Sequence, residues 1–500
     1  MLLEELSRHR GLDLPPPSDP LLQMLCCAAE RSPDKTAIID SQGAHSYREL
    51  FARAKEFAET LQGANVGPNA TVALSMRKEF SYVQAVLGCL LSGNAFLPID
   101  PTYPLERANY MIEDAGAVAC AINLDMCARV QTPILIDTRA LPQNRSAVSD
   151  LALRLTTAYT IYTSGTTGRP KGVPITSSAL ARFIATQGEA LNVTEGSRFA
   201  SVSSISFDMS IWEMFMALCH GASIVMLDRD TIVDGRKLGA ALKDHAVSHV
   251  LMTPSMLSLL PADTYPALRY VVSAGEKCDP QTVATWSGVS SFFDAYGATE
   301  ATIYTTIIRK TPDTPLACVG LPMAGSEIAI VGDDGRRLKQ RETGEICIVG
   351  NAVSYGYHNR PELNTRVFGV LENKRFYRTG DIGYLDDAGR LYCKGRADRQ
   401  VKFNGSRIEL EEIERVSNQT DLVTRSVATL HTTGSGKTFL YLFTVPKVRG
   451  TFSVNSFRAA LRAVLPGFMM PSRIFTVPEI PLTSNGKVDI PRLTITSEEG

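Results

Sequence analysis

The 500-residue sequence has no excess of charge of either sign. Its 51 lysine and arginine residues face 52 aspartate and glutamate residues, which gives a formal net charge of −1. A nucleic-acid surface needs a basic patch or stripe, and nothing in this balance indicates one. We therefore expect no nucleic-acid partner.

Long apolar runs and paired cysteines are also missing. No stretch approaches 18 uninterrupted apolar residues, and acidic residues interrupt the N-terminal MLLEELSRHRG, where a signal peptide needs a continuous apolar region. The ten cysteines form no CxxC pair and lie mostly in apolar runs, as Cys89, Cys219 and Cys347 do. We expect a soluble, unsecreted, cytoplasmic protein with reduced thiols and no membrane partner.

What the chain does have is material for a large core, because 44% of its residues are hydrophobic. From residue 71, short apolar strands alternate with helices (TVALSM, EFSYVQAVLGCLLSG, AFLPID), a pattern that predicts parallel βαβ units. Short strands and turns dominate from about residue 316, and a new unit begins near residues 395–399. The predicted fold is α/β: residues 1–396 form a core of layered sheets with a β-rich subdomain, and residues 397–500 form a small α+β lobe.

The segment YTSGTTGRPKGV, residues 162–173, combines hydroxyl groups, glycines and one lysine. Such a loop offers hydroxyl donors, closely approaching backbone N–H groups and a positive charge to an anion. A strand-like run precedes it, and SSALARFIATQGEAL after it has helical spacing with Ser177 or Ser178 as a possible cap, so a helix N-terminus would face the same anion. A flexible surface loop is the alternative for such a composition. The ordered string SGTTGxPKG favours a polyphosphate cradle that is not a Walker A loop.

Two other patterns imitate known sites. GSGKT at residues 434–438 lacks the first glycine of a Walker A motif, since His431 stands there, and it lies between two strand-like runs. We interpret it as a hairpin turn. His245 and His249 are four residues apart, but Ala246 replaces the glutamate of H-E-x-x-H and no third ligand is near. A zinc site is not expected.

Several further strings occur in a fixed order along nearly the whole chain: GNAFLPIDPTYPLER (93–107), FDMSIWEMF (207–215), DAYGATE (294–300), YRTGDIG (377–383), GRADRQVKFNGSRIELEEIE (395–414) and SNGKVD (484–489). Together with the 162–173 loop, the chain resembles the adenylate-forming (ANL) superfamily, which includes acyl-CoA synthetases, luciferases and the adenylation domains of nonribosomal peptide synthetases. The resemblance is close to the last of these. It implies ATP-dependent formation of an acyl-AMP with release of pyrophosphate, followed by capture of the acyl group by a thiol.

The resemblance assigns roles to residues of this sequence. The nucleotide would be held by the following set: Thr163, Ser164, Gly165, Thr166, Thr167, Gly168 and Lys171 for the β- and γ-phosphates; Thr299 for the α-phosphate; Asp294, Ala295, Tyr296 and Gly297 for adenine; Asp381 and Arg396 for the ribose. Tyr296 offers a flat face to adenine, and Asp294 would accept from its exocyclic amine. Glu300 would bind Mg²⁺, a hard cation that prefers oxygen ligands.

Lys487 is the expected catalytic residue. It would bridge the substrate carboxylate and the α-phosphate, where negative charge develops as pyrophosphate leaves. In this family the C-terminal lobe rotates between the two half-reactions, and the residue that matches the hinge is Asp398.

Asp208 occupies the place where amino-acid-activating members hold the substrate ammonium group. A helix-capping role is the structural alternative. The side-chain pocket implied by the resemblance is apolar with a single hydroxyl, and its residues are Met209, Trp212, Leu251, Val272, Ala274, Ala295, Ile303 and Tyr304. Because a charged side chain would be left unpaired there, we expect a hydrophobic amino acid. The choices between aromatic and aliphatic, and between α- and β-amino acids, remain open.

We expect the acceptor to be the phosphopantetheine arm of a separate carrier protein in specialised peptide or polyketide biosynthesis. The first rival is an acyl- or aryl-CoA ligase for a non-amino acid. A luciferase-like oxygenase and a catalytically inactive nucleotide-binding protein are further rivals. Two residues depart from the family pattern: Ala298 replaces the usual proline of YGPTE, and Ser177 stands where a histidine often follows PKGV.

Overall fold

The computed structural model describes residues 19–124, 130–141, 156–165, 169–261, 263–433, 437–448, 452–481 and 488–493. These residues form two compact units. The first falls within Met1–Pro101, Met111–Tyr162 and Gly172–Gly395, and the second within Thr102–Tyr110, Thr163–Lys171 and Arg396–Gly500. The predicted division lay one residue later, after Arg396, and it assigned residues 102–110 and 163–171 to the N-terminal part. Contacts with residues far away in the sequence place these two short segments in the second unit, and the sequence alone does not show such contacts.

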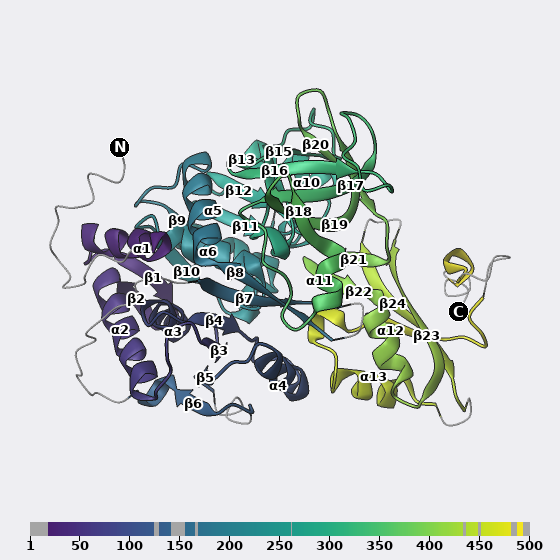
Figure 1. The fold of residues 1–500 in the computed structure, drawn as a ribbon, viewed down its shortest axis with the longest axis horizontal. Coiled ribbons are helices and arrows are strands. Elements are labelled where there is room, and N and C mark those ends of the chain that lie inside the picture. The colour runs from purple at the N-terminus through teal and green to yellow at the C-terminus, as the bar shows by residue number, and fades with distance from the viewer. Residues whose placement is uncertain are drawn as a thin grey trace. The chain divides into compact units, whose positions relative to one another are not determined.

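The first unit contains a 14-stranded mixed sheet (Figure 1). Its parallel strands are β1 (Thr36–Asp40), β9 (Arg198–Ser201), β10 (Ser223–Met226), β11 (His249–Met252), β12 (Tyr270–Ser273) and β13 (Ser291–Tyr296). Antiparallel pairing adds β2 (Gly43–Ser46), β14 (Thr306–Arg309), β15 (Cys318–Pro322), β16 (Ser326–Val331), β17 (Gly344–Gly350), β18 (Phe368–Leu371), β19 (Lys374–Leu385) and β20 (Leu391–Arg396). The predicted change to short strands and turns near residue 316 is confirmed.

A second sheet of six strands has the order β6-β5-β3-β4-β7-β8. Its strands are β3 (Thr71–Ser75), β4 (Ala95–Pro98), β5 (Ala119–Ile122), β6 (Ile134–Asp137), β7 (Thr157–Thr163) and β8 (Lys171–Thr176). The pairs β3–β4, β3–β5, β5–β6 and β4–β7 are parallel, which confirms the βαβ pattern predicted from residue 71 onward.

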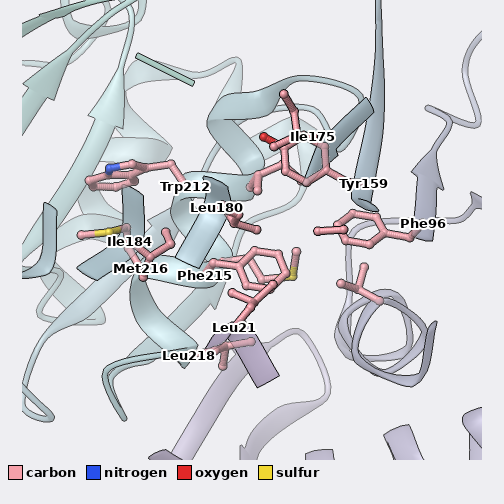
Figure 2. Packing of buried hydrophobic residues seen from close by; sticks show 14 of the residues in the cluster. Leu21, Phe96, Tyr159, Ile175, Leu180, Ile184, Trp212, Phe215, Met216 and Leu218 are labelled. Atoms are coloured by element: carbon pink, nitrogen blue, oxygen red, sulfur yellow. The ribbon is translucent and has the colours of Figure 1, made fainter. Parts of the chain in front are cut away.

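The helices of this part of the chain are α1 (Pro20–Arg31), α2 (Tyr47–Gly63), α3 (Phe80–Leu91), α4 (Leu105–Asp114), α5 (Ser177–Ala190), α6 (Asp208–Leu218), α7 (Arg229–Ile232), α8 (Gly235–Asp244), α9 (Pro254–Leu257), α10 (Pro280–Val289) and α11 (Pro361–Val367). Helix α3 packs on β3 and β4 and also on β1, so it lies between the two sheets. Figure 2 shows Phe96 of β4 and Tyr159 of β7 near Phe215 of α6 in this shared core. No helix among the described residues is long and apolar enough to cross a membrane.

Both faces of the parallel strands are buried, but against different partners. Because side chains alternate along a strand, Leu251 and Val272 belong to the core cluster that contains Trp212 of α6, whereas their neighbours Val250 and Val271 belong to a second cluster. That second cluster contains side chains of α8 and α10. The sheet therefore separates the α6 side, where the predicted substrate residues lie, from the side covered by α8 and α10.

The second unit has a two-stranded and a three-stranded sheet. Its elements are β21 (Gln400–Phe403), β22 (Ser406–Glu409), α12 (Leu410–Asn418), β23 (Val423–Thr432), β24 (Thr438–Pro446), α13 (Val454–Arg462) and β25 (Arg473–Thr476). Strands β23 and β24 pair antiparallel with Thr432 opposite Thr438, which confirms the hairpin predicted around GSGKT. Residues 434–436 of that turn lie outside the described residues.

Candidate active site

The eight residues predicted to line the substrate pocket all belong to one buried cluster of the first unit. They are Met209, Trp212, Leu251, Val272, Ala274, Ala295, Ile303 and Tyr304. The polar atoms of the two largest are paired: the Trp212 indole N–H donates to the Tyr304 hydroxyl (3.0 Å), which donates to Oε1 of Gln187 on α5 (2.7 Å). The set is thus apolar, with its one hydroxyl engaged inside the protein.

Asp208 is the first residue of α6 and is partly buried. Phe207 is the N-cap of this helix and makes no side-chain capping bond, and the Asp208 carboxylate accepts a hydrogen bond from the Thr299 hydroxyl at 2.6 Å. A carboxylate in the first helical turn is stabilised by the helix dipole. The predicted ammonium ligand and the predicted α-phosphate ligand are therefore adjacent.

The Tyr159 hydroxyl is buried near this carboxylate. Burial raises its pKa well above the usual value, and the charge of Asp208 raises the pKa further. Tyr159 therefore stays a neutral phenol beside the carboxylate.

A tight loop connects Thr299 to the pocket residues. A Cβ atom on Gly297 would lie 2.3 Å from Cα of Tyr304, so no larger residue fits there without a backbone shift. Thr302 and Ile303 both have positive φ (62° and 71°), and the Thr302 hydroxyl donates to the Ala352 carbonyl at 2.7 Å. A β-branched residue such as Ile303 is strained in this conformation.

The residues predicted to bind ribose and adenine include a buried pair. The Tyr296 hydroxyl donates to the Asp381 carboxylate at 2.6 Å, and both residues are buried. Burial, followed by the charge of Asp381, raises the pKa of Tyr296 well above its usual value. The pair keeps Tyr296 protonated, with its ring held by the carboxylate.

Glu300 is fully buried and accepts a hydrogen bond from the Tyr357 hydroxyl at 2.6 Å. The described residues contain no group of three or more His, Cys, Asp or Glu side chains suited to hold a metal ion. One fixed carboxylate nevertheless fits Mg²⁺, because this ion keeps several waters and is commonly held by one or two carboxylates together with substrate phosphates.

Asp294 was predicted to accept a hydrogen bond from adenine, but its carboxylate has a buried partner within the protein. Its carboxylate forms an ion pair with Lys310, whose ammonium also donates to the carbonyls of Leu316 (3.0 Å) and Cys318 (3.2 Å). The Cys278 thiol lies 3.5 Å from the same carboxylate, and Cys278 belongs to the cluster on the α8–α10 side of the sheet. Ala295 lies in the cluster on the opposite side. Alternation along β13 thus turns Asp294 away from the pocket, and we assign it a structural role.

Of the loop predicted to hold the phosphates, the described residues between Thr163 and Lys171 belong to the second unit, where acidic side chains contact them. The Ser164 hydroxyl donates to the Arg407 carbonyl (2.7 Å), and the Gly165 N–H donates to Glu412 (3.3 Å). Nζ of Lys171, a buried residue, lies 4.0 Å from Glu409. The loop donors therefore already interact with a carbonyl and carboxylates. Thr166, Thr167 and Gly168, which are also predicted to hold the phosphates, lie outside the described residues.

The loop ends in a strand, not in a helix. Lys171 begins β8, and α5 begins six residues later with Thr176 as its N-cap, which accepts from the Ala179 N–H at 3.2 Å. A strand of this length spans about 20 Å. The prediction that Ser177 or Ser178 caps this helix is wrong, because Thr176 is the cap.

Ser177 has a different partner. Its hydroxyl donates to the Asp19 carboxylate at 2.7 Å, and Asp19 also caps α1 by accepting from the Leu21 and Leu22 N–H groups. This departure from the family pattern joins α1 to α5 through a buried hydrogen bond. Nothing in the structure assigns a comparable contact to Ala298.

The predicted hinge carries an ion pair within the second unit. The Arg396 guanidinium contacts the Asp398 carboxylate at 2.7 and 2.8 Å. Burial raises the pKa of Asp398, but the hydrogen bond and the charge of Arg396 outweigh burial and bring the pKa below its usual value. Lys487, the predicted catalytic residue, lies outside the described residues.

The structure also confirms the exclusion of a zinc-binding helix at His245 and His249. His245 is the C-cap of α8, whereas His249 begins β11, so the two do not share a helix face. His249 stacks between Phe199 and Tyr270, and its Nε2 atom lies 3.0 Å from the Leu191 carbonyl. Among the described residues no cysteine forms a disulfide bond.

Sequence reasoning missed two buried polar residues of this region, Gln187 and Lys310. Each has polar or charged neighbours in the sequence, Gln187 in ATQGEA and Lys310 in RKTPD, so nothing local marks it as buried. The pairing with Tyr304 or Asp294 identifies it.

Comparison with known proteins gives consistent matches. The family model for AMP-binding enzyme matches residues 27–358. Tyrocidine synthase 2 from Brevibacillus parabrevis is 33% identical over 470 residues, covering 92% of this chain and 13% of that protein. Novobiocin biosynthesis protein H from Streptomyces niveus is 33% identical over 477 residues, covering 91% of this chain and 79% of that protein. The chain thus spans a small part of the first of these relatives and most of the second.

Solved structures share the fold. A nonribosomal peptide synthetase protein with adenylation and PCP domains has a TM-score of 0.84 at 24% identity, over 95% of this chain and 84% of that one. The o-succinylbenzoate CoA synthetase from Bacillus subtilis has a TM-score of 0.83 at 23% identity, over 94% of this chain and 98% of that one. At these identities the likeness shows the fold alone. The family match and the relatives at 33% identity show more. Within the adenylate-forming (ANL) superfamily the chain is similar to the nonribosomal peptide synthetase adenylation enzymes, and it belongs to the AMP-binding enzyme family.

Proposed function

We propose that the chain activates a hydrophobic amino acid with ATP and Mg²⁺ and then transfers it to the phosphopantetheine thiol of a separate carrier protein. In the first step a substrate carboxylate oxygen bonds to the α-phosphorus of ATP while the bond from that phosphorus to the bridging oxygen breaks and pyrophosphate leaves. In the second step the thiol sulfur bonds to the acyl carbon, AMP leaves, and the thiol proton passes to solvent. The relatives of peptide-synthetase type support this proposal.

The observation that carries the proposal is the 2.6 Å contact between Asp208 and Thr299. An amino acid bears its ammonium and its carboxylate only one or two carbons apart, so the group that pairs with the ammonium must lie next to the group that holds the α-phosphate. Asp208 is suited to the ammonium and Thr299 to the phosphate oxygen. An aryl or fatty acid has no ammonium group to pair with the Asp208 carboxylate.

The remaining roles are those that the family resemblance implies. Glu300 would hold Mg²⁺, which when bound neutralises charge on the phosphate oxygens. Ser164, Gly165 and Lys171 would hold the β- and γ-phosphates. Asp381 and Arg396 would hold the ribose, and Tyr296 would cover adenine. Lys487 would stabilise the transferring oxygen, and Asp398 would serve as the hinge.

The test is ATP–pyrophosphate exchange over a panel of amino acids and of matched acids that lack the amino group. We expect exchange with one or a few apolar amino acids. Asp208→Asn should lower kcat/KM for the amino acid at least about 30-fold, because truncating one partner of a desolvated charge pair costs about 2–5 kcal/mol. Loading of a phosphopantetheinylated carrier protein tests the second step. Exchange driven only by acids without an amino group, with CoA as the acceptor, would instead identify a CoA ligase.

A further inference from the structure

Gln187 is a buried amide at the edge of the predicted pocket that no assigned role explains. It lies on α5, is 1% exposed, and is surrounded by apolar residues of the main core cluster. Its Oε1 atom accepts from the Tyr304 hydroxyl at 2.7 Å, and its amide nitrogen contacts the Met323 sulfur. A buried amide with both ends engaged fixes the groups that it bonds.

The contact determines what Tyr304 can offer to a ligand. A phenol has one proton to donate, and that proton goes to Gln187, while the Trp212 indole N–H occupies one of its lone pairs. Trp212 and Tyr304 are both at most 1% exposed, and Phe183 meets the Tyr304 ring edge-on at 4.8 Å. Phe183 and Gln187 are four residues apart on α5, so one helix face holds both the ring and the hydroxyl of Tyr304.

We propose that Gln187 is a specificity-determining residue: by taking the Tyr304 proton it removes the only hydroxyl donor of the predicted pocket and makes the enzyme discriminate against substrate side chains that carry a hydrogen-bond acceptor. This inference rests on the proposed function. The substrate class that it defines is an amino acid whose side chain is apolar and free of acceptor atoms. Gln187 acts through Tyr304 and is a positioning residue, not a catalytic one.

The test compares two substrates of equal shape in which only an acceptor atom differs. Suitable pairs are phenylalanine with 4-pyridylalanine, at a pH that keeps the pyridine neutral, and norleucine with O-ethylserine. The measured quantity is the ratio of kcat/KM values within a pair in ATP–pyrophosphate exchange. In Gln187→Leu the buried Tyr304 proton loses its acceptor, and the acceptor-bearing substrate can restore the bond. We expect the ratio to rise about tenfold toward that substrate, the equivalent of one recovered hydrogen bond of about 1.4 kcal/mol.

Three variants separate this effect from a general loosening of the pocket. Removing the Tyr304 hydroxyl also takes away the acceptor of the Trp212 indole N–H, so the control must remove both donors. The triple variant Gln187→Leu/Tyr304→Phe/Trp212→Phe has neither proton to offer, and its ratio should return to the wild-type value. Tyr304→Phe alone leaves the Gln187 carbonyl without its donor, so a donor-bearing substrate, tyrosine compared with phenylalanine, should gain instead. Phe183→Leu alters the packing of the Tyr304 ring without touching the hydroxyl and should change both members of a pair alike.

The outcomes distinguish this inference from the proposed function. If the wild-type enzyme activates no amino acid, the proposed function fails. If it activates amino acids but the ratio in Gln187→Leu is unchanged, or rises equally in the triple variant, the role of Gln187 is refuted. Should Gln187→Leu fail to fold by thermal melting, Tyr304→Phe still decides, because an absent gain for tyrosine contradicts the proposal.

Discussion

Replacing Lys310 by methionine tests the structural role assigned to the Asp294–Lys310 pair. The Lys310 side chain is 0% exposed and that of Asp294 is 5% exposed, so Lys310→Met leaves a carboxylate buried without its cation. Breaking a buried pair in this way costs about 3–5 kcal/mol of the free energy of unfolding. In Asp294→Asn/Lys310→Met no charge remains, and the carbonyls of Leu316 and Cys318 lose one donor, a cost of about 1–2 kcal/mol. The double variant should therefore be more stable than the single variant by about 2 kcal/mol.

Denaturation with guanidinium, followed by tryptophan fluorescence, measures these differences in the first unit. Both tryptophans of the chain report on it, because Trp212 lies in one core cluster and Trp286 in the other. The KM for ATP in the double variant should stay near the wild-type value. A double variant less stable than Lys310→Met, or one of normal stability with a large rise in the KM for ATP, would refute the structural assignment and return Asp294 to the adenine site.

Two further predictions concern other buried groups. Burial lowers the pKa of His249 from 6.5 to about 4, so between these two pH values the unfolded chain binds a proton that the folded chain does not. The free energy of unfolding should therefore fall by about 2 kcal/mol between pH 7 and pH 5. His249→Phe should flatten this dependence in denaturation curves measured across that range. Gly297→Ala places a methyl group 2.3 Å from Cα of Tyr304 and should lower kcat/KM for the amino acid, while the matched Gly288→Ala on α10, which meets no atom within 4 Å, leaves exchange activity unchanged.

The part of the fold predicted from sequence is the part with a strong local pattern. Apolar runs of strand length separated by helices gave the parallel strands β3, β4 and β5, and the shorter strands after residue 316 gave the β-rich part. The helix predicted over SSALARFIATQGEAL is present as α5, which begins at Ser177, but Thr176 and not one of the two following serines is its N-cap. Local chemistry identifies the helix but not which of three adjacent hydroxyl residues caps it.

The site residues were predicted from strings of the family and from their places between those strings. The eight residues of the predicted pocket lie in one buried cluster, and their role as its lining stays a prediction. Asp294 lies in such a string too, yet its partner Lys310 comes 16 residues later, directly after β14, the strand that pairs antiparallel with β13. Asp294 faces Ile308 in that pairing, and no sequence pattern fixes this register or the side of the sheet to which the carboxylate points.

The loop from Gly297 to Tyr304 links the two halves of the proposed chemistry. It begins with Thr299 and Glu300, the proposed ligands of phosphate and Mg²⁺, and ends with Ile303 and Tyr304 of the predicted pocket. The Thr305 N–H donates to the Tyr296 carbonyl at 2.8 Å, which closes the loop at its base. Two consecutive residues with positive φ leave the backbone little freedom to adjust. A substrate side chain that displaces Tyr304 must therefore also move Thr299, whose hydroxyl contacts Asp208. Discrimination against a wrong side chain should then appear in kcat as well as in KM, because misplacement of the reacting groups slows the chemical step.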